Sequence, residues 1–171
     1  RHFLAFHVGA GIGVPYGNSR ALPFEKRFYA GGANSVRGWS VRTLGPGAFD
    51  SRNSVTDFIN QCGDIRLDLS LEYRAKLFWV FEGAAFLDAG NIWTIHAYEN
   101  QPGGMFRFST FWKQIALAYG VGLRMDFTYF LLRFDLGVKA YNPAMNQQRW
   151  PLLHPDWKRD TAFHFAVGYP F

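Results

Sequence analysis

Apolar side chains alternate with small or polar ones along several stretches of this chain. In the clearest stretch, 64–74, five apolar residues alternate with charged and small polar residues: Ile65, Leu67, Leu69, Leu71 and Tyr73. Successive side chains of a β-strand point to opposite faces of a sheet, so this period of two predicts a strand with one apolar and one polar face. The same period predicts further strands over about 2–16, 78–91, 113–127, 130–140 and 161–171.

The faces opposite the apolar residues carry either glycine or charge. Gly9, Gly11 and Gly13 share one face of the first predicted strand, which leaves room for another part of the chain to pack there. Their spacing is also that of a dinucleotide-binding loop, but the following sequence, with Pro15, predicts no helix, and this excludes that reading.

Long and short connections alternate between the predicted strands. The long ones cover about 17–63, 94–110 and 141–158, and the short ones are expected at 75–77 and near Thr128. Within the first long connection, 25–29 and 40–44 are expected to pair as a short hairpin. Transmembrane β-barrels have short turns at one end and longer loops at the other, whereas Greek-key connections would not produce this alternation.

Composition supports the same class of fold. The 171 residues are 49% hydrophobic and 19% aromatic, and the mean hydropathy is −0.11. No run of eighteen or more apolar residues occurs, so helical spans are not expected. A soluble, aromatic-rich β-sandwich is the alternative that composition leaves open. The pattern and the loop lengths together predict an all-β, antiparallel transmembrane β-barrel.

Charge and candidate chemistry argue against several functions. The net charge of +5 is scattered, without a basic stripe interleaved with aromatic residues, so nucleic acid is not an expected partner. The single cysteine, Cys62, has no evident base, the five histidines lack the spacing of metal ligands, and no Gly-x-Ser-x-Gly motif occurs. We therefore expect no enzyme, no metal and no cofactor. A start at Arg1, inside a predicted strand, predicts a processed or truncated product.

Three motifs stand out in the sequence. The first long connection carries Val36–Arg37–Gly38–Trp39 behind two consecutive glycines, and a later strand carries Phe86–Leu87–Asp88–Ala89–Gly90. The planar guanidinium of Arg37 suits a buried carboxylate. The last predicted strand alternates aromatic and aliphatic residues and ends on an aromatic one: Phe163, Phe165, Val167, Gly168, Tyr169 and Phe171.

In this order the three motifs resemble those of the Omp85 superfamily, the barrel proteins that assemble or export outer-membrane proteins. The resemblance covers 1–171 and implies that the loop of about 17–63 folds back into the barrel. It implies that Arg37 meets Asp88 on the barrel wall. Glu72, which the alternation of 64–74 places on the polar face, is the next candidate partner. Glu82 is expected on the same inner face.

The resemblance also implies a location and a function. We expect an integral protein of the bacterial outer membrane that assists insertion of outer-membrane proteins through a seam, the junction between the first and last strands of a barrel. Expected partners are outer-membrane lipids, unfolded client proteins and accessory assembly lipoproteins. A polypeptide-exporting two-partner secretion transporter and a simple pore are the alternatives. About six predicted strands suggest either the C-terminal part of a larger barrel or a small closed barrel of about eight strands.

Overall fold

The computed structural model describes residues 1–49, 61–145, 150–153 and 156–168, which contain six strands in one antiparallel sheet. The neighbours in the sheet follow chain order, from β1 at one edge to β6 at the other. The strands are β1 (His2–Ile12), β2 (Ile65–Phe78), β3 (Phe81–Trp93), β4 (Ala116–Asp126), β5 (Leu131–Tyr141) and β6 (Thr161–Val167). The predicted all-β, antiparallel fold is therefore confirmed.

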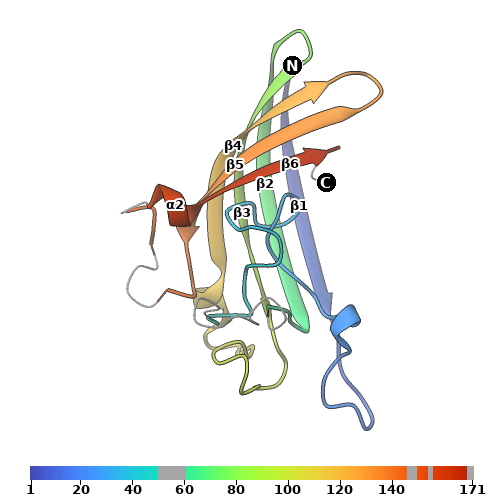
Figure 1. The fold of residues 1–171 in the computed structure, drawn as a ribbon, viewed down its shortest axis with the longest axis vertical. Coiled ribbons are helices and arrows are strands. Elements are labelled where there is room, and N and C mark those ends of the chain that lie inside the picture. Colours follow the sequence, from blue (N-terminus) through green and yellow to red (C-terminus); the bar gives the residue numbers. More distant parts are fainter. Residues whose placement is uncertain (50–60, 146–149, 154–155, 169–171) are drawn as a thin grey trace.

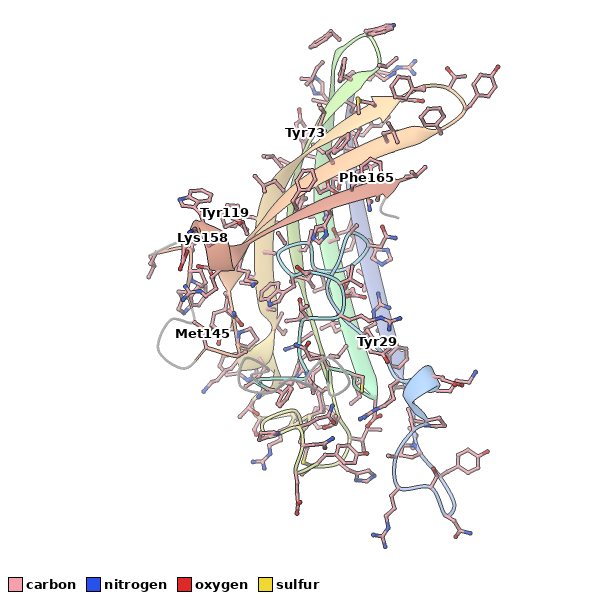
Figure 2. All side chains as sticks on the ribbon, in the orientation of Figure 1. Tyr29, Tyr73, Tyr119, Met145, Lys158 and Phe165 are labelled. Carbon is pink, nitrogen blue, oxygen red and sulfur yellow. The ribbon has the colours of Figure 1, made fainter. Side chains whose placement is uncertain are left out.

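The alternating sequence pattern gives the sheet two unlike faces. The convex, outer face carries apolar side chains, and Leu4 and Phe6 on β1 are 71% and 68% exposed there. The concave face carries glycines and charged residues, and most of its charged side chains are buried. The strands curve around a central segment of the chain, and side chains project from both faces (Figures 1 and 2).

Long connections leave one end of the sheet and short turns close the other, as predicted (Figure 1). One turn lies elsewhere than expected. The segment 75–77 belongs to β2, and the chain reverses at Trp79 and Val80 instead. Trp79 takes a positive φ of 50°, and the β2–β3 register shifts between Lys76 and Phe78. Because neither turn residue is glycine, asparagine or proline, no residue type in the sequence marks the reversal.

The long loop between β1 and β2 enters the concave side of the sheet (Figure 1). Within its described part it contains one short 3₁₀ helix, η1 (Phe24–Lys26). The expected hairpin of 25–29 with 40–44 does not form. Phe28 pairs with Gly63 instead, and the isolated antiparallel bridge to Leu44 comes from Ala30, which lies outside 25–29. The glycines of β1 do leave room for the loop, since a Cβ at Gly11 would lie 2.8 Å from the Phe28 ring.

Short helical turns precede two strands where the sequence predicted strand or loop. η2 (Phe111–Gln114) occupies the expected beginning of β4, and α2 (Trp157–Asp160) leads directly into β6. Asp156 caps α2 by accepting a hydrogen bond from the Lys158 N–H at 3.1 Å. β6 ends at Val167, and the predicted continuation to Tyr169 and Phe171 lies outside the described residues.

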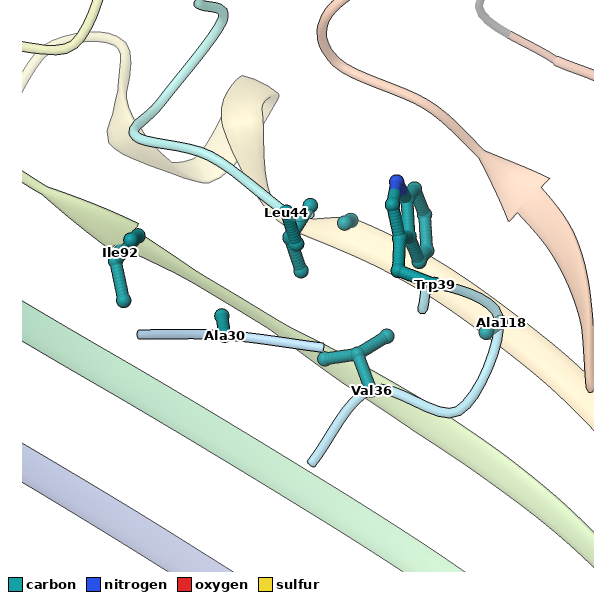
Figure 3. Close-up of a cluster of buried hydrophobic side chains, with 7 residues drawn as sticks. Ala30, Val36, Trp39, Leu44, Ile92 and Ala118 are labelled. Atoms are coloured by element: carbon teal, nitrogen blue, oxygen red, sulfur yellow. The ribbon is translucent and has the colours of Figure 1, made fainter. Parts of the chain in front are cut away.

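The main hydrophobic core lies between the long loop and the concave face, rather than between two sheets. It consists of Ala30, Val36, Trp39 and Leu44 from the loop packed against Ile92, Ala116 and Ala118 at the sheet (Figure 3). Burial of these side chains fixes the loop against β3 and β4, because each apolar group removed from water stabilises the contact.

The sheet is open at β1 and β6. Among the described residues the long loop contributes no strand to it, so these strands form part of a barrel wall rather than a closed barrel of eight strands. No helix in the described part of the chain is long and apolar enough to cross a membrane.

Candidate functional site: an arginine loop bound to the inner wall

The loop segment 29–39, called here the arginine loop, presents Arg37 to the sheet. Gly31 and Gly32 have φ angles of 99° and 102°, a region that glycine adopts without strain. A Cβ at Gly31 would overlap the Ser40 carbonyl oxygen. The Gly32 N–H donates to the Trp39 carbonyl at 2.9 Å, which closes the loop and directs Arg37 towards the wall. The consecutive glycines in the sequence are therefore required by the turn.

Asp88 on β3 is the principal partner of Arg37. The Nε and Nη2 atoms of Arg37 donate to the two carboxylate oxygens of Asp88 at 2.7 and 2.8 Å, and the Arg37 backbone N–H donates to Oδ2 at 3.0 Å. Both residues are 1% exposed. This bidentate, charge-assisted geometry is the strongest that an arginine makes with a carboxylate.

Two residues of β2 complete the binding of Arg37. Glu72 accepts from Arg37 Nη1 at 2.5 Å. Ser70 Oγ accepts from Arg37 Nη2 at 3.1 Å and donates to Asp88 Oδ1 at 2.6 Å, so it orients the carboxylate. Burial lowers the pKa of the Arg37 guanidinium, but hydrogen bonds and charge from Asp88 and Glu72 outweigh it and raise that pKa above its ordinary value. A guanidinium does not lose its proton in proteins, so Arg37 carries its charge within the wall.

The contacts of Arg37 belong to a larger network, called here the arginine cluster. It contains three arginines and three carboxylates, all 1% exposed or less: Arg37, Arg124 and Arg133 with Glu72, Asp88 and Asp135. Arg124 Nη2 donates to Glu72 at 3.0 Å and Nη1 donates to Asp135 at 2.5 Å. Direct contact between opposite charges allows such groups to remain ionised away from water.

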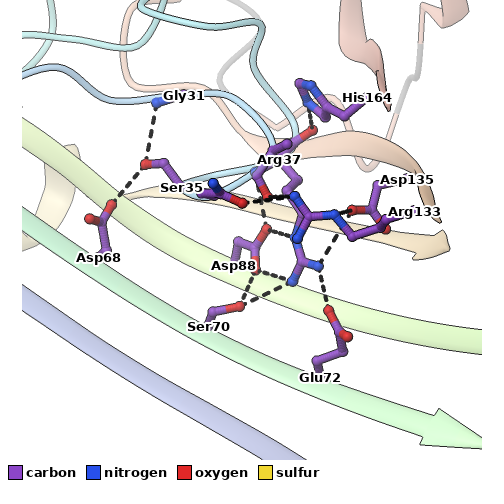
Figure 4. Close-up of polar contacts among 12 residues, drawn as sticks. Gly31, Ser35, Arg37, Asp68, Ser70, Glu72, Asp88, Arg133, Asp135 and His164 are labelled. Carbon is purple, nitrogen blue, oxygen red and sulfur yellow. Dashed lines mark hydrogen bonds and ion pairs between the residues drawn. The ribbon is translucent and has the colours of Figure 1, made fainter. Parts of the chain in front are cut away.

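Arg133 binds the arginine loop from β5. Its Nη2 donates to the Ala33 carbonyl at 3.0 Å and to the Asn34 Oδ1 at 2.8 Å. On the opposite side, Ser35 Oγ donates to Asp68 Oδ1 on β2 at 2.9 Å. The loop is thus held by side chains from strands on both sides of Arg37 (Figure 4).

Aromatic and glycine residues define the space in which Arg37 binds. Its guanidinium lies 3.6 Å from the centroid of the Phe86 ring, which is within cation–π range. A Cβ at Gly120 would lie 2.6 Å from the Phe86 ring, so glycine there leaves space for that ring. A Cβ at Gly38 would lie 2.6 Å from the Ala118 Cβ. Only glycine therefore fits at position 38 with the loop this close to β4. A Cβ at Gly90 would overlap the Leu67 carbonyl oxygen, so glycine is required there as well.

The structure brings together most of the residues singled out in the sequence. Arg37, Asp88 and Glu72 meet, Phe86 lies beneath the guanidinium, and Val36 and Trp39 enter the hydrophobic core. Glu82 shares the inner face and is 6% exposed, but it lies opposite Lys76 and Arg124, towards the short turns. No hydrogen bond or ion pair joins Glu82 to Arg37 in the described part of the chain.

Only part of the last-strand motif lies within the described residues. Phe163, Phe165 and Val167 project from the outer face and are each more than half exposed. Gly168 has a φ of 95°, and its N–H donates to the Leu131 carbonyl at 2.9 Å. Tyr169 and Phe171 lie outside the described residues.

Sequence reasoning missed several members of the site. Ser70, Arg124, Arg133 and Asp135 alternate with the apolar residues of their strands, but the sequence did not assign them to Arg37. Opposite charges at inward positions of neighbouring strands were the signal available. Their pairing also depends on strand register, which the alternation alone does not supply.

The curved antiparallel sheet and the arginine loop define a class of membrane β-barrel in which a loop is bound inside the wall. The model of the Omp85 superfamily domain matches residues 1–171, and the chain belongs to the Omp85 superfamily. It is therefore part of an integral β-barrel of the bacterial outer membrane, as the sequence motifs implied.

Within this superfamily the chain is similar to BamA. It is 27% identical over 176 residues to the outer membrane protein assembly factor BamA of Neisseria meningitidis serogroup B (strain ATCC BAA-335 / MC58), covering 94% of this chain and 21% of that protein. Its fold is similar to the crystal structure of BamA from Haemophilus ducreyi lacking POTRA domains 1–3, with a TM-score of 0.59 and 18% identity, covering 96% of this chain and 32% of that one. The chain thus spans a minority of each relative.

Proposed function

We propose that this chain forms the C-terminal barrel wall of an outer-membrane protein assembly factor, and that the arginine loop makes this wall rigid. The observation that carries the proposal is the burial of Arg37 among Asp88, Glu72 and Ser70. Membership of the Omp85 superfamily and similarity to an assembly factor support the assignment of the process. The role proposed for the cluster is structural rather than catalytic.

The physical reason for rigidity is the cost of moving a buried charge. Releasing Arg37 leaves Asp88 and Glu72 uncompensated inside the wall, and breaking a buried ion pair typically costs about 3–5 kcal/mol. The loop therefore holds β2 and β3 directly through Arg37, and β5 through Arg133. A wall held in this way presents its edge strand in a constant geometry.

A defined edge is what strand addition requires. β6 has seven residues, whereas β5, beside it, has eleven, and β6 is one of the two edges of the sheet in the described structure. An unfolded client protein would pair with an edge at the seam through main-chain hydrogen bonds. We propose unfolded outer-membrane proteins as clients, with outer-membrane lipids and accessory assembly lipoproteins as further partners.

The proposal is tested in cells in which the only copy of the full-length protein carries a substitution of Arg37. Arg37→Ala should lower the levels of folded outer-membrane proteins while the barrel itself remains inserted, as judged by membrane fractionation and heat-modifiable migration. Arg20→Ala is the matched control, because Arg20 lies in the same loop and is exposed.

Three outcomes would overturn the proposed function. Wild-type levels of folded clients in the Arg37→Ala cells would show that the cluster is not needed for assembly. Normal client levels together with a changed ion conductance of the purified protein would indicate a simple pore instead. Loss of one exported polypeptide, with all barrel clients intact, would indicate a two-partner secretion transporter.

A further inference from the structure

A side chain of the last strand that the sequence motifs do not include forms a hydrogen bond with the arginine loop. His164 on β6 is 7% exposed, and its Nε2 lies 2.9 Å from the backbone carbonyl oxygen of Arg37 (Figure 4). Phe163 and Phe165 project outward, so the alternation of the strand directs His164 to the inner face. A carbonyl oxygen only accepts hydrogen bonds, so Nε2 carries the hydrogen and donates it.

The wall beside His164 is shaped to admit the loop backbone. Asp135 on β5 is the register partner of His164, and Gly137 is the partner of Ala162. A Cβ at Gly137 would overlap the Arg37 carbonyl oxygen and would lie 3.0 Å from the Gly38 nitrogen. The Arg37–Gly38 peptide therefore packs directly on β5, within reach of β6, and this close approach depends on glycine at position 137.

A second contact joins the same motif to the segment that leads into β6. Lys139 on β5 places its Nζ 5.3 Å from the centroid of the Trp39 ring and donates to the Arg159 carbonyl in α2 at 3.0 Å. α2 ends at Asp160, and β6 begins at the next residue. The arginine loop thus contacts β6 through His164 and the entry to β6 through Lys139.

We propose that His164 is a positioning residue that couples the arginine loop to β6, so that release of Arg37 from Asp88 loosens this strand. The proposal rests on the proposed function and deepens it, because it gives a path from the buried cluster to the edge that would receive a client. The side chain of Arg37 binds β2 and β3, while its backbone carbonyl holds β6 through His164.

The test measures amide hydrogen exchange in the purified full-length protein in lipid nanodiscs. His164→Asn keeps an amide but is too short to place a donor where Nε2 lies, whereas His164→Gln reaches it. Exchange of the amides in 161–168 should be about tenfold faster in His164→Asn, because a hydrogen bond to a buried carbonyl is lost, and within about twofold of wild type in His164→Gln. His96→Leu, at an exposed histidine, is the matched control and should leave these amides unchanged.

Coupling is tested by combining the variants. Arg37→Ala should also accelerate exchange in 161–168, and the Arg37→Ala/His164→Asn double variant should exchange no faster than the faster single variant, because both changes release the same contact. Equal exchange in wild type and His164→Asn would overturn the proposal, as would an equal acceleration throughout β2 and β3. Exchange is read without any client, so failure of this coupling is distinguishable from failure of the assembly function.

Discussion

The two faces of this sheet are built from the same alternating strands but are stabilised in different ways. The outer face carries Leu87 and Val121, which are 55% and 60% exposed and suit a lipid environment. The inner face carries Asp88, which is 1% exposed and makes specific hydrogen bonds to Arg37. Leu87 and Asp88 are neighbours in sequence, yet one needs only an apolar surrounding and the other needs a particular partner.

This difference indicates where substitutions are tolerated. On the outer face, one apolar residue replaces another with little change, because lipid chains adapt to the new shape. On the inner face, each charged group is fixed by the positions of others, so even a small change at Gly137 affects a loop residue 100 positions earlier, Arg37. Tolerance of a substitution on the outer face thus depends on the class of the residue. On the inner face it depends on the identity of the residue and on strand register.

On the outer face, the largest effect is expected for Leu87→Arg. Leu87 lies at the middle of β3 on the outer face, and an arginine at the bilayer midplane costs about 2–4 kcal/mol. The free energy of unfolding of the full-length protein in phospholipid vesicles, measured by urea titration, should fall by that amount. Leu87→Phe should lie within about 0.5 kcal/mol of wild type, and an equal loss in both variants would show that Leu87 does not face lipid.

A smaller effect is expected for Gly137→Ala on the inner face. The added Cβ would overlap the Arg37 carbonyl oxygen, and overpacking of this kind costs about 1–3 kcal/mol. Gly83→Ala is the matched control on β3, because the atom nearest to its Cβ, in the flexible Leu77 side chain, is 3.4 Å away. The free energy of unfolding should fall for Gly137→Ala only; equal losses in the two variants would contradict the close packing of the arginine loop on β5.

The sequence was sufficient to predict most of the fold, because period-two alternation and loop length are local properties. It failed at Trp79, where a two-residue turn forms without a typical turn residue. It also failed in the long loop, where packing of Phe28 and Leu44 against the wall replaces the expected hairpin. In the long loop, tertiary contacts rather than local preference determine the conformation.

The candidate site was predicted only as far as its motifs extend. Arg37 and Asp88 were paired through a family resemblance, since 51 residues separate them and alternation does not bring them together. His164 alternates with outward-facing aromatic residues, so its inward direction could be read from the sequence. Its partner could not, because the partner is a backbone carbonyl, which no residue type reveals.

A double-mutant cycle between Arg37 and Asp88 tests the central claim most directly. The free energies of unfolding of Arg37→Ala, Asp88→Ala and the double variant are compared with wild type in the same vesicles. The buried, bidentate geometry predicts a coupling free energy of about 2 kcal/mol or more, so that the double variant is much less destabilised than the sum of the two single variants. Additivity within about 0.5 kcal/mol would show that Arg37 and Asp88 do not interact in the membrane, and would contradict a loop bound inside the wall.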